Sequence, residues 1–76
     1  MTLGEDRVRL GFNPSSNTAV TDVKRQTAAL IDQAQDLLAV LEHSDEGGEI
    51  VRCLKLAQTR YKEAAMWLVK ALTAGV

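Results

Sequence analysis

Apolar residues in the second half of the chain begin as a one-sided helical stripe and then spread around the helix. Met66, Trp67 and Val69 lie off the stripe, which repeats at alternating spacings of four and three residues like a coiled-coil seam. The seam positions are Ile50, Leu54, Ala57, Tyr61, Ala64, Leu68 and Ala71. A helix that is apolar on several faces must be covered on several faces, and a chain of 76 residues leaves too little to cover it. We therefore predict an obligate oligomer in which folding and assembly are coupled.

A second apolar stripe occupies the first half of the chain and predicts a long amphipathic helix over residues 18–43. Asn17 is the expected N-cap, with Thr21 as a later alternative. The stripe repeats at three- and four-residue spacings and consists of Val20, Val23, Thr27, Leu30, Ile31, Ala34, Leu37, Leu38 and Leu41.

Residues 44–48 interrupt the helical pattern, because Gly47 and Gly48 disfavour a helix. The following stripe predicts a second helix over residues 49–73, with Gly75 as its stop. At 1.5 Å per residue the two helices are about 39 Å and about 37 Å long. Matched lengths and a short connection predict an all-α fold, an antiparallel helical hairpin in one domain of residues 1–76.

Residues 1–17 read as an irregular arm, because Gly4, Gly11 and Pro14 break regular structure and a cluster of Ser and Asn residues follows. A short extended piece is an option here, since apolar residues alternate with Arg and Gly at Val8, Leu10 and Phe12.

Charge narrows the function classes. The formal net charge of −1 argues against a general binder of DNA or RNA polymers or of membrane surfaces, which carries a strong positive excess. Residues 26–49 are acidic and residues 50–76 are mainly basic, so the two helices should attract each other.

No apolar run approaches the roughly 20 residues of a membrane span, and no export signal is visible. Cys53 is the only cysteine, which fits a reducing cytosol.

Catalytic chemistry has little support in the sequence. His43 lies at a predicted helix end, where it can cap or remain solvated. Asp32 and Asp36 share a helix face and either hold a cation together or form a solvated surface, the more common situation. Cys53 has no partner for metal binding or nucleophilic catalysis, so we expect a small buried hydrophobe. We predict no enzyme activity, no cofactor and no metal.

Phosphate binding is the better chemical candidate. Residues 12–17 lead into a helix that carries Lys24 and Arg25 in its second turn, so an aromatic ring, a helix N-terminus and two cations could converge on a phosphorylated base. The competing interpretation is structural. Phe12 then covers the apolar seam, the Ser and Asn residues cap the helix, and Lys24 and Arg25 are solvated. From these residues alone the structural interpretation is favoured. Trp67 is assigned to a subunit interface, as large aromatics at helical spacing usually are.

Two segments resemble small phage proteins of the anti-CBASS cyclic-nucleotide sponge family, related through their helical hairpin to the Thoeris anti-defence sponges. Residues 61–72 are similar to the family's Ala-rich helix end that contains Met-Trp. Residues 7–15, followed by residues 20–32, are similar to its N-terminal arm and first helix.

The resemblance implies a hexamer of hairpins that binds cyclic di- or trinucleotides between subunits without cleaving them, in the cytoplasm of an infected bacterium. It implies that the ring of Phe12 stacks on bases and that Lys24 or Arg25 meets the phosphates. This chain has Phe12 where the family pattern has Tyr, so stacking remains but the ring hydroxyl is absent. Supporting contacts fall on Asn13 and Thr27, and Arg52 would serve a second pocket for larger rings. The alternative is a hairpin scaffold or protein-interaction module without a nucleotide ligand.

Overall fold

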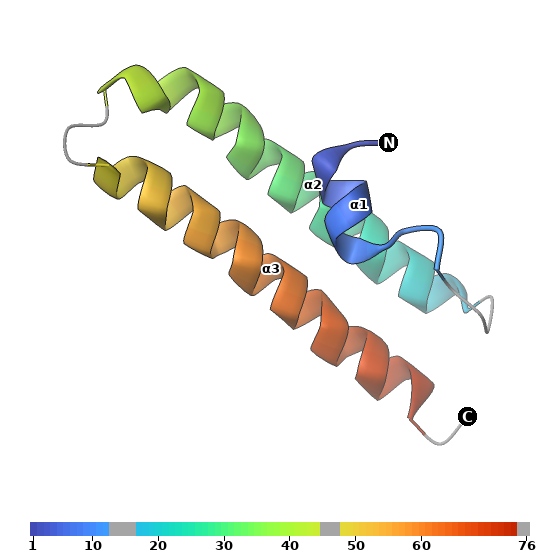
Figure 1. Ribbon diagram of the computed structural model, residues 1–76. Coiled ribbons are helices and arrows are strands. Elements are labelled where there is room, and N and C mark those ends of the chain that lie inside the picture. Colours follow the sequence, from blue (N-terminus) through green and yellow to red (C-terminus); the bar gives the residue numbers. More distant parts are fainter. Residues whose placement is uncertain (13–16, 45–47, 75–76) are drawn as a thin grey trace.

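The computed structural model describes residues 1–12, 17–44 and 48–74. Two long helices lie side by side and run antiparallel, and a short helix lies across the first of them (Figure 1). The chain is therefore a helical hairpin, as its hydrophobic pattern predicts, and no strand occurs in the described ranges. The elements are α1 (Leu3–Val8), α2 (Thr18–Leu41), the 3-10 turn η1 (Glu42–Ser44) and α3 (Glu49–Thr73).

Local chemistry sets the ends of the long helices. The Asn17 side chain caps α2 by accepting hydrogen bonds from the backbone N–H of Ala19 at 2.8 Å and of Val20 at 3.4 Å. The α-helix stops at Leu41, two residues before the expected end, because the chain tightens into η1. Gly48 precedes α3 with a left-handed φ of 76°, which favours glycine. The rest of the expected turn, residues 45–47, and the expected stop at Gly75 lie outside the described residues.

The expectation of an irregular or extended arm was wrong, because Leu3–Val8 form α1. Thr2 and Glu5 make a capping box, in which each side chain bonds the backbone N–H of the other residue, at 3.1 Å and 2.8 Å. The helix ends at Val8, and the left-handed φ of 55° at the following Arg9 lets the N–H of Leu10 reach the carbonyl of Glu5 at 3.0 Å. The Thr-x-x-Glu spacing was a signal for this helix that the alternating apolar residues obscured.

Close backbone approach holds α1 on α2. A Cβ added at Gly4 would lie 2.0 Å from the carbonyl oxygen of Ala28, so only glycine fits at this position. The N–H of Gly4 donates to Asp32 Oδ1 at 2.6 Å. Asp32 is therefore not a purely solvated residue, because it fastens α1, while Asp36 remains exposed.

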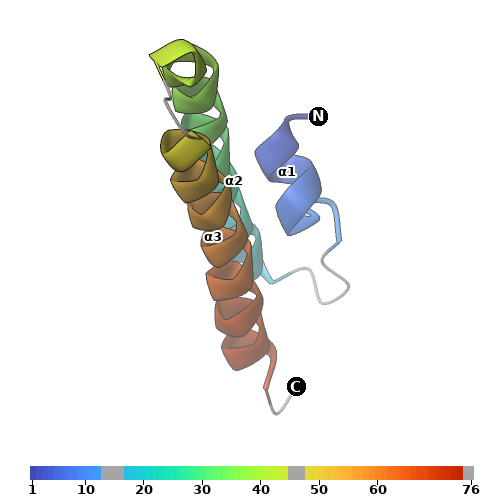
Figure 2. The same cartoon turned by 60° about the vertical axis from the view of Figure 1, so that its left-hand side comes forward.

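The core is small because the molecule is thin. Its Cα atoms extend over 48 × 21 × 12 Å, so little space lies between the helix backbones in the shortest dimension. Figure 2 shows α1 on one side of the α2–α3 pair, and the core lies where the three helices meet. Its buried residues are Val8, Ala28, Ile31 and Ala65, surrounded by Leu3, Leu10, Val23 and Tyr61.

The buried face of α3 departs from the predicted seam in its second half. Ile50, Leu54, Ala57 and Tyr61 are half-buried, as the seam requires. Burial then continues at Ala65, Val69 and Thr73, whereas the predicted positions Ala64, Leu68 and Ala71 are exposed. A straight helix drifts relative to a 3.5-residue repeat, and here Ala65 faces Val8 of α1 in the shared core.

Polar contact between the long helices comes from an amide. Gln58 Nε2 donates to the carbonyl of Ile31 at 3.2 Å and to Gln35 Oε1 at 3.1 Å. The ion pairs recorded in the described part of the chain, Arg52–Glu49 and Arg60–Glu63, lie within α3. The acidic and basic character of the two helices is therefore not expressed there as ion pairs between them.

Candidate functional site

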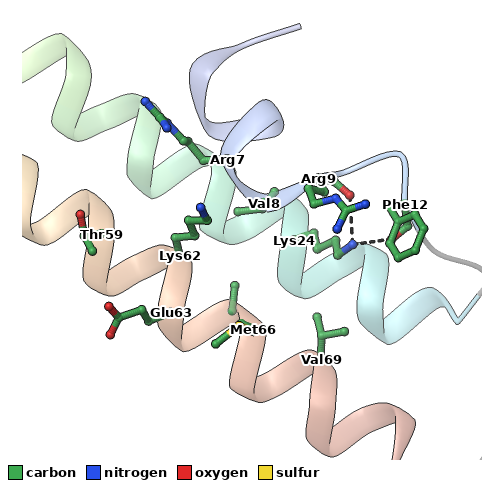
Figure 3. Close-up of a pocket in the computed structure, with 11 residues that line it drawn as sticks. Arg7, Val8, Arg9, Phe12, Lys24, Thr59, Lys62, Glu63, Met66 and Val69 are labelled. Atoms are coloured by element: carbon green, nitrogen blue, oxygen red, sulfur yellow. Dashed lines mark hydrogen bonds between the residues drawn. The ribbon is translucent and has the colours of Figure 1, made fainter.

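A cavity of about 580 Å³ lies where the C-terminal end of α1 approaches α3. Its size falls within the roughly 300 to 1,000 Å³ typical of small-molecule sites. Figure 3 shows its lining side chains coming from α1 and the residues that follow it, from Lys24 of α2, and from the middle of α3. Four basic residues and one acidic residue line it, so its surroundings are positive; the basic ones are Arg7, Arg9, Lys24 and Lys62.

Lys24 is buried beneath the segment that follows α1, with only 6% of its surface exposed. Its ammonium donates to the carbonyl of Arg9 at 3.0 Å and to the carbonyl of Phe12. Burial lowers the pKa of Lys24, and the positive charge of Arg9 lowers it further. An ammonium has three N–H donors, so two of them are engaged with backbone.

Phe12 presents an aromatic surface beside these cations. The residue is 53% exposed, and the guanidinium carbon of Arg9 lies 4.3 Å from the ring centroid. Lys24 Nζ lies 5.6 Å from the same centroid. Both distances are within the range of cation–π attraction, so the ring is bordered by two cations and remains accessible.

The opposite wall of the cavity comes from α3. Lys62 points from α3 toward the α1 side, whereas Glu63 points away from it (Figure 3). Glu63 Oε2 accepts from Arg60 Nη1 at 2.9 Å, so the acidic residue of the lining is paired with a cation of its own helix. Met66, Val69 and Ala65 add an apolar floor. The cavity thus combines cations, an exposed ring and apolar surface, which suits an anionic ligand with flat aromatic groups.

The structure brings together some of the predicted site residues and separates others. Phe12 and Lys24 both line the cavity. Thr27 is buried one turn beyond Lys24, and Arg25 is exposed and does not line the cavity. Arg52 lies in the first turn of α3, ten residues or about 15 Å of helix before Lys62. Asn13 lies outside the described residues, as do residues 14–16 of the expected phosphate-binding turn.

Arg52 forms an ion pair with a carboxylate of its own helix. Its Nη2 lies 2.6 Å from Glu49 Oε1 and its Nε donates to Glu49 Oε2 at 3.1 Å. This bidentate pair lowers the pKa of Glu49, with a smaller contribution from the Cys53 thiol, and raises the pKa of Arg52. Both side chains are exposed, so the pair is a surface contact of small energetic weight.

Two other predicted roles can be placed. Cys53 is exposed on α3, so the expectation of a small buried hydrophobe was wrong; α3 turns this position away from α2. His43 is exposed within η1 at the end of the first long helix. In residues 1–12, 17–44 and 48–74, no group of three or more His, Cys, Asp or Glu residues is placed to hold a metal ion.

Sequence reasoning missed Arg7, Arg9 and Lys62 as site residues. Arg7 and Arg9 were assigned to an irregular arm, and only helix formation by Leu3–Val8 brings them beside α3. Lys62 lies in an apolar and basic stretch that was interpreted from the sequence only as a surface for oligomerisation. The spacing of Thr2 and Glu5 would have predicted α1, but no local pattern indicates which face of α3 meets it.

No helix within the described ranges has the length and apolar character needed to cross a membrane. A family model for the hairpin domain of Acb2/Tad1 matches residues 5–73, nearly the whole chain. Neither a curated protein nor a solved structure matches the chain. The Acb2/Tad1 family is known for anti-defence proteins that act as sponges for cyclic oligonucleotides. The match includes the last four residues of α1, both long helices and every residue that lines the cavity, so this chain belongs to the Acb2/Tad1 hairpin-domain family.

Proposed function

We propose that the protein binds cyclic oligonucleotide immune messengers and sequesters them without cleavage, which keeps the effectors of a bacterial CBASS defence system from being activated. Cyclic dinucleotides are the primary ligands and cyclic trinucleotides a further class. The observation that carries the proposal is the cavity in which an exposed Phe12 ring and four cations meet.

The side chains of the cavity match the parts of such a ligand. Cyclic oligonucleotides carry phosphates and flat bases, which are bound by cations and by aromatic stacking. Arg7, Arg9 and Lys62 are the exposed cations and are assigned to the phosphates. Arg9 borders one side of the Phe12 ring, so a base would use the remaining accessible surface of the ring.

Sequestration requires affinity and copy number, and no catalytic group is assigned. The protein acts as an oligomer, for which the family resemblance suggests six copies. A two-fold axis between neighbouring chains would present two Phe12 rings to a ligand that is itself close to two-fold symmetric.

The test is calorimetry with a panel of cyclic dinucleotides, followed by heat denaturation of the complex and analysis of the released ligand by mass spectrometry. Phe12→Ala removes the stacking surface and should weaken binding by about 1–3 kcal/mol per stacked base. Phe12→Tyr is the matched control, because it retains the ring and should retain the affinity.

Release of intact ligand after denaturation supports a sponge. Saturation at 100 times the dissociation constant should also stabilise the protein by about 2.7 kcal/mol in a thermal melt. Release of a linear product would instead indicate a nuclease. An absence of binding to the whole panel would favour a hairpin scaffold, to which the exposed apolar residues of α3 are also suited.

A further inference from the structure

Lys24 differs from the other cations of the cavity in its surroundings. Arg7, Arg9 and Lys62 are exposed, whereas only 6% of the surface of Lys24 is exposed. Its ammonium reaches across the start of α2 to two carbonyls of the preceding segment, those of Arg9 and Phe12. These two carbonyls flank the turn that separates α1 from the Phe12 ring.

The bonding partners of Lys24 fix the geometry of the aromatic site. The Phe12 N–H donates to the carbonyl of Arg9 at 2.9 Å, so residues 9–12 close a turn, and the ammonium spans both of its ends. Arg9 holds a left-handed φ of 55°, which directs this turn. A non-glycine residue keeps that conformation only where its surroundings impose it.

We propose that Lys24 is a positioning residue: it acts on the ligand through Phe12 and Arg9 by fastening the turn that carries them, and it is not the principal contact of a phosphate. Burial of the Lys24 residue, with two carbonyl acceptors in place for its ammonium, supports this role. The lowered pKa of Lys24 agrees with an ammonium that is shielded from solvent. The effect on ligand affinity rests on the proposed function, whereas the fastening of the turn does not.

The ligand-free test uses the chain's only phenylalanine. Growth on 4-fluorophenylalanine labels Phe12 alone, so the fluorine NMR signal reports a single ring. Lys24→Met keeps an unbranched side chain that is one heavy atom shorter and removes the ammonium. In this variant we expect a narrower fluorine line, because the ring becomes mobile, and faster hydrogen exchange at the amide of Phe12 by roughly tenfold or more.

Arg25→Met is the matched control, because it removes a neighbouring exposed cation of the same helix and should leave the line width and the exchange rate unchanged. Circular dichroism should show that both variants keep their helices. Loss of a nearby charge alone would move the fluorine signal without narrowing it. Unchanged line width and unchanged exchange in Lys24→Met would therefore overturn the proposal.

Salt titration with cyclic di-AMP as the probe tests the consequence for binding. Exposed charges are screened by salt, whereas buried ones are screened much less. Lys24→Met should weaken binding about tenfold at every salt concentration, with the slope of the wild type. Lys62→Met should weaken binding mainly at low salt and give a shallower slope. A shallower slope for Lys24→Met would assign Lys24 to the phosphate and contradict the proposal.

Failure of wild-type protein to bind the probe would count against the proposed ligand and leave the fluorine result to decide the role of Lys24.

Discussion

At the scale of single residues, a glycine allows α1, which lines one side of the cavity, to pack against α2. Gly4 faces the backbone of Ala28 so closely that no side chain fits between α1 and α2. Gly11, two residues beyond the left-handed Arg9, has no heavy atom within 4 Å of the position that a Cβ would take. Two glycines of one short segment therefore have opposite tolerance to substitution, for a reason that their sequence context does not reveal.

Gly4→Ala should destabilise the protein by about 1–3 kcal/mol, the usual range for forcing extra volume into a packed contact. The new methyl would displace α1 from α2 because it meets backbone, which cannot move aside as a flexible side chain could. Urea unfolding at fixed protein concentration measures the change. Gly11→Ala is the control and should unfold within about 0.5 kcal/mol of wild type; equal losses in the two variants would contradict the close approach.

Phe12 and Lys24 were predictable as a pair, because both stand close to the start of a predicted helix, whereas Arg7 and Arg9 were not predicted as site residues. The individual roles of Phe12 and Lys24 were not predictable. Whether a lysine meets a phosphate or a carbonyl depends on where the backbone of residues 9–12 lies, and that path is set by a turn whose residues have no strong turn preference of their own, apart from Gly11.

At the scale of elements, α1 is stable through its attachments. Six residues are too few for an isolated helix, because nucleation is unfavourable and short helices are marginal in water. Its capping box satisfies N–H groups at the first turn, and Asp32 accepts a further N–H from Gly4. The two long helices follow from their apolar periodicity alone, but α1 requires tertiary contacts that periodicity does not contain.

Asp32→Ala should loosen α1, because the N–H of Gly4 loses its acceptor in a half-buried position. We expect a loss of about 1–3 kcal/mol in the free energy of unfolding. Hydrogen exchange should accelerate first in α1, since the helix can open without the hairpin.

Asp36→Ala removes a carboxylate one helical turn further along α2, at an exposed position, and provides the comparison. Its stability should stay within about 0.5 kcal/mol of wild type. If Asp32→Ala behaves in the same way, the bond to Gly4 contributes nothing measurable.

At the scale of the whole molecule, a chain whose Cα atoms span only 12 Å in the shortest dimension cannot enclose the apolar residues of its longest helix. Trp67 is 61% exposed, Met66 58% and Leu68 52%, all within one turn of α3. Exposed apolar clusters of this kind mark association surfaces. Of the off-seam residues that the sequence marks as needing cover, Met66 and Trp67 remain exposed in the single chain, whereas Val69 is half-buried.

We expect the wild-type protein to sediment as an oligomer at micromolar concentration and Trp67→Glu to shift it toward smaller species. Large aromatics at interface centres commonly contribute 2 kcal/mol or more, so the dissociation constant should rise on the order of tenfold or more. Gln33→Glu adds the same charge at an exposed polar position of α2 and should sediment like wild type. A wild-type protein that sediments as a well-folded single chain would refute the assembly.

Arg9 meets two opposing demands at one position, one from the backbone and one from the neighbouring ring. A left-handed backbone costs most residues about 1–2 kcal/mol that glycine does not incur, yet here the position carries the guanidinium that lies over Phe12. Arg9→Gly would remove the strain of the left-handed backbone and would also remove the guanidinium that lies over the Phe12 ring. The left-handed turn at residue 9 therefore sets backbone strain against a cation for the Phe12 ring, and an arginine there supplies the cation while carrying the strain.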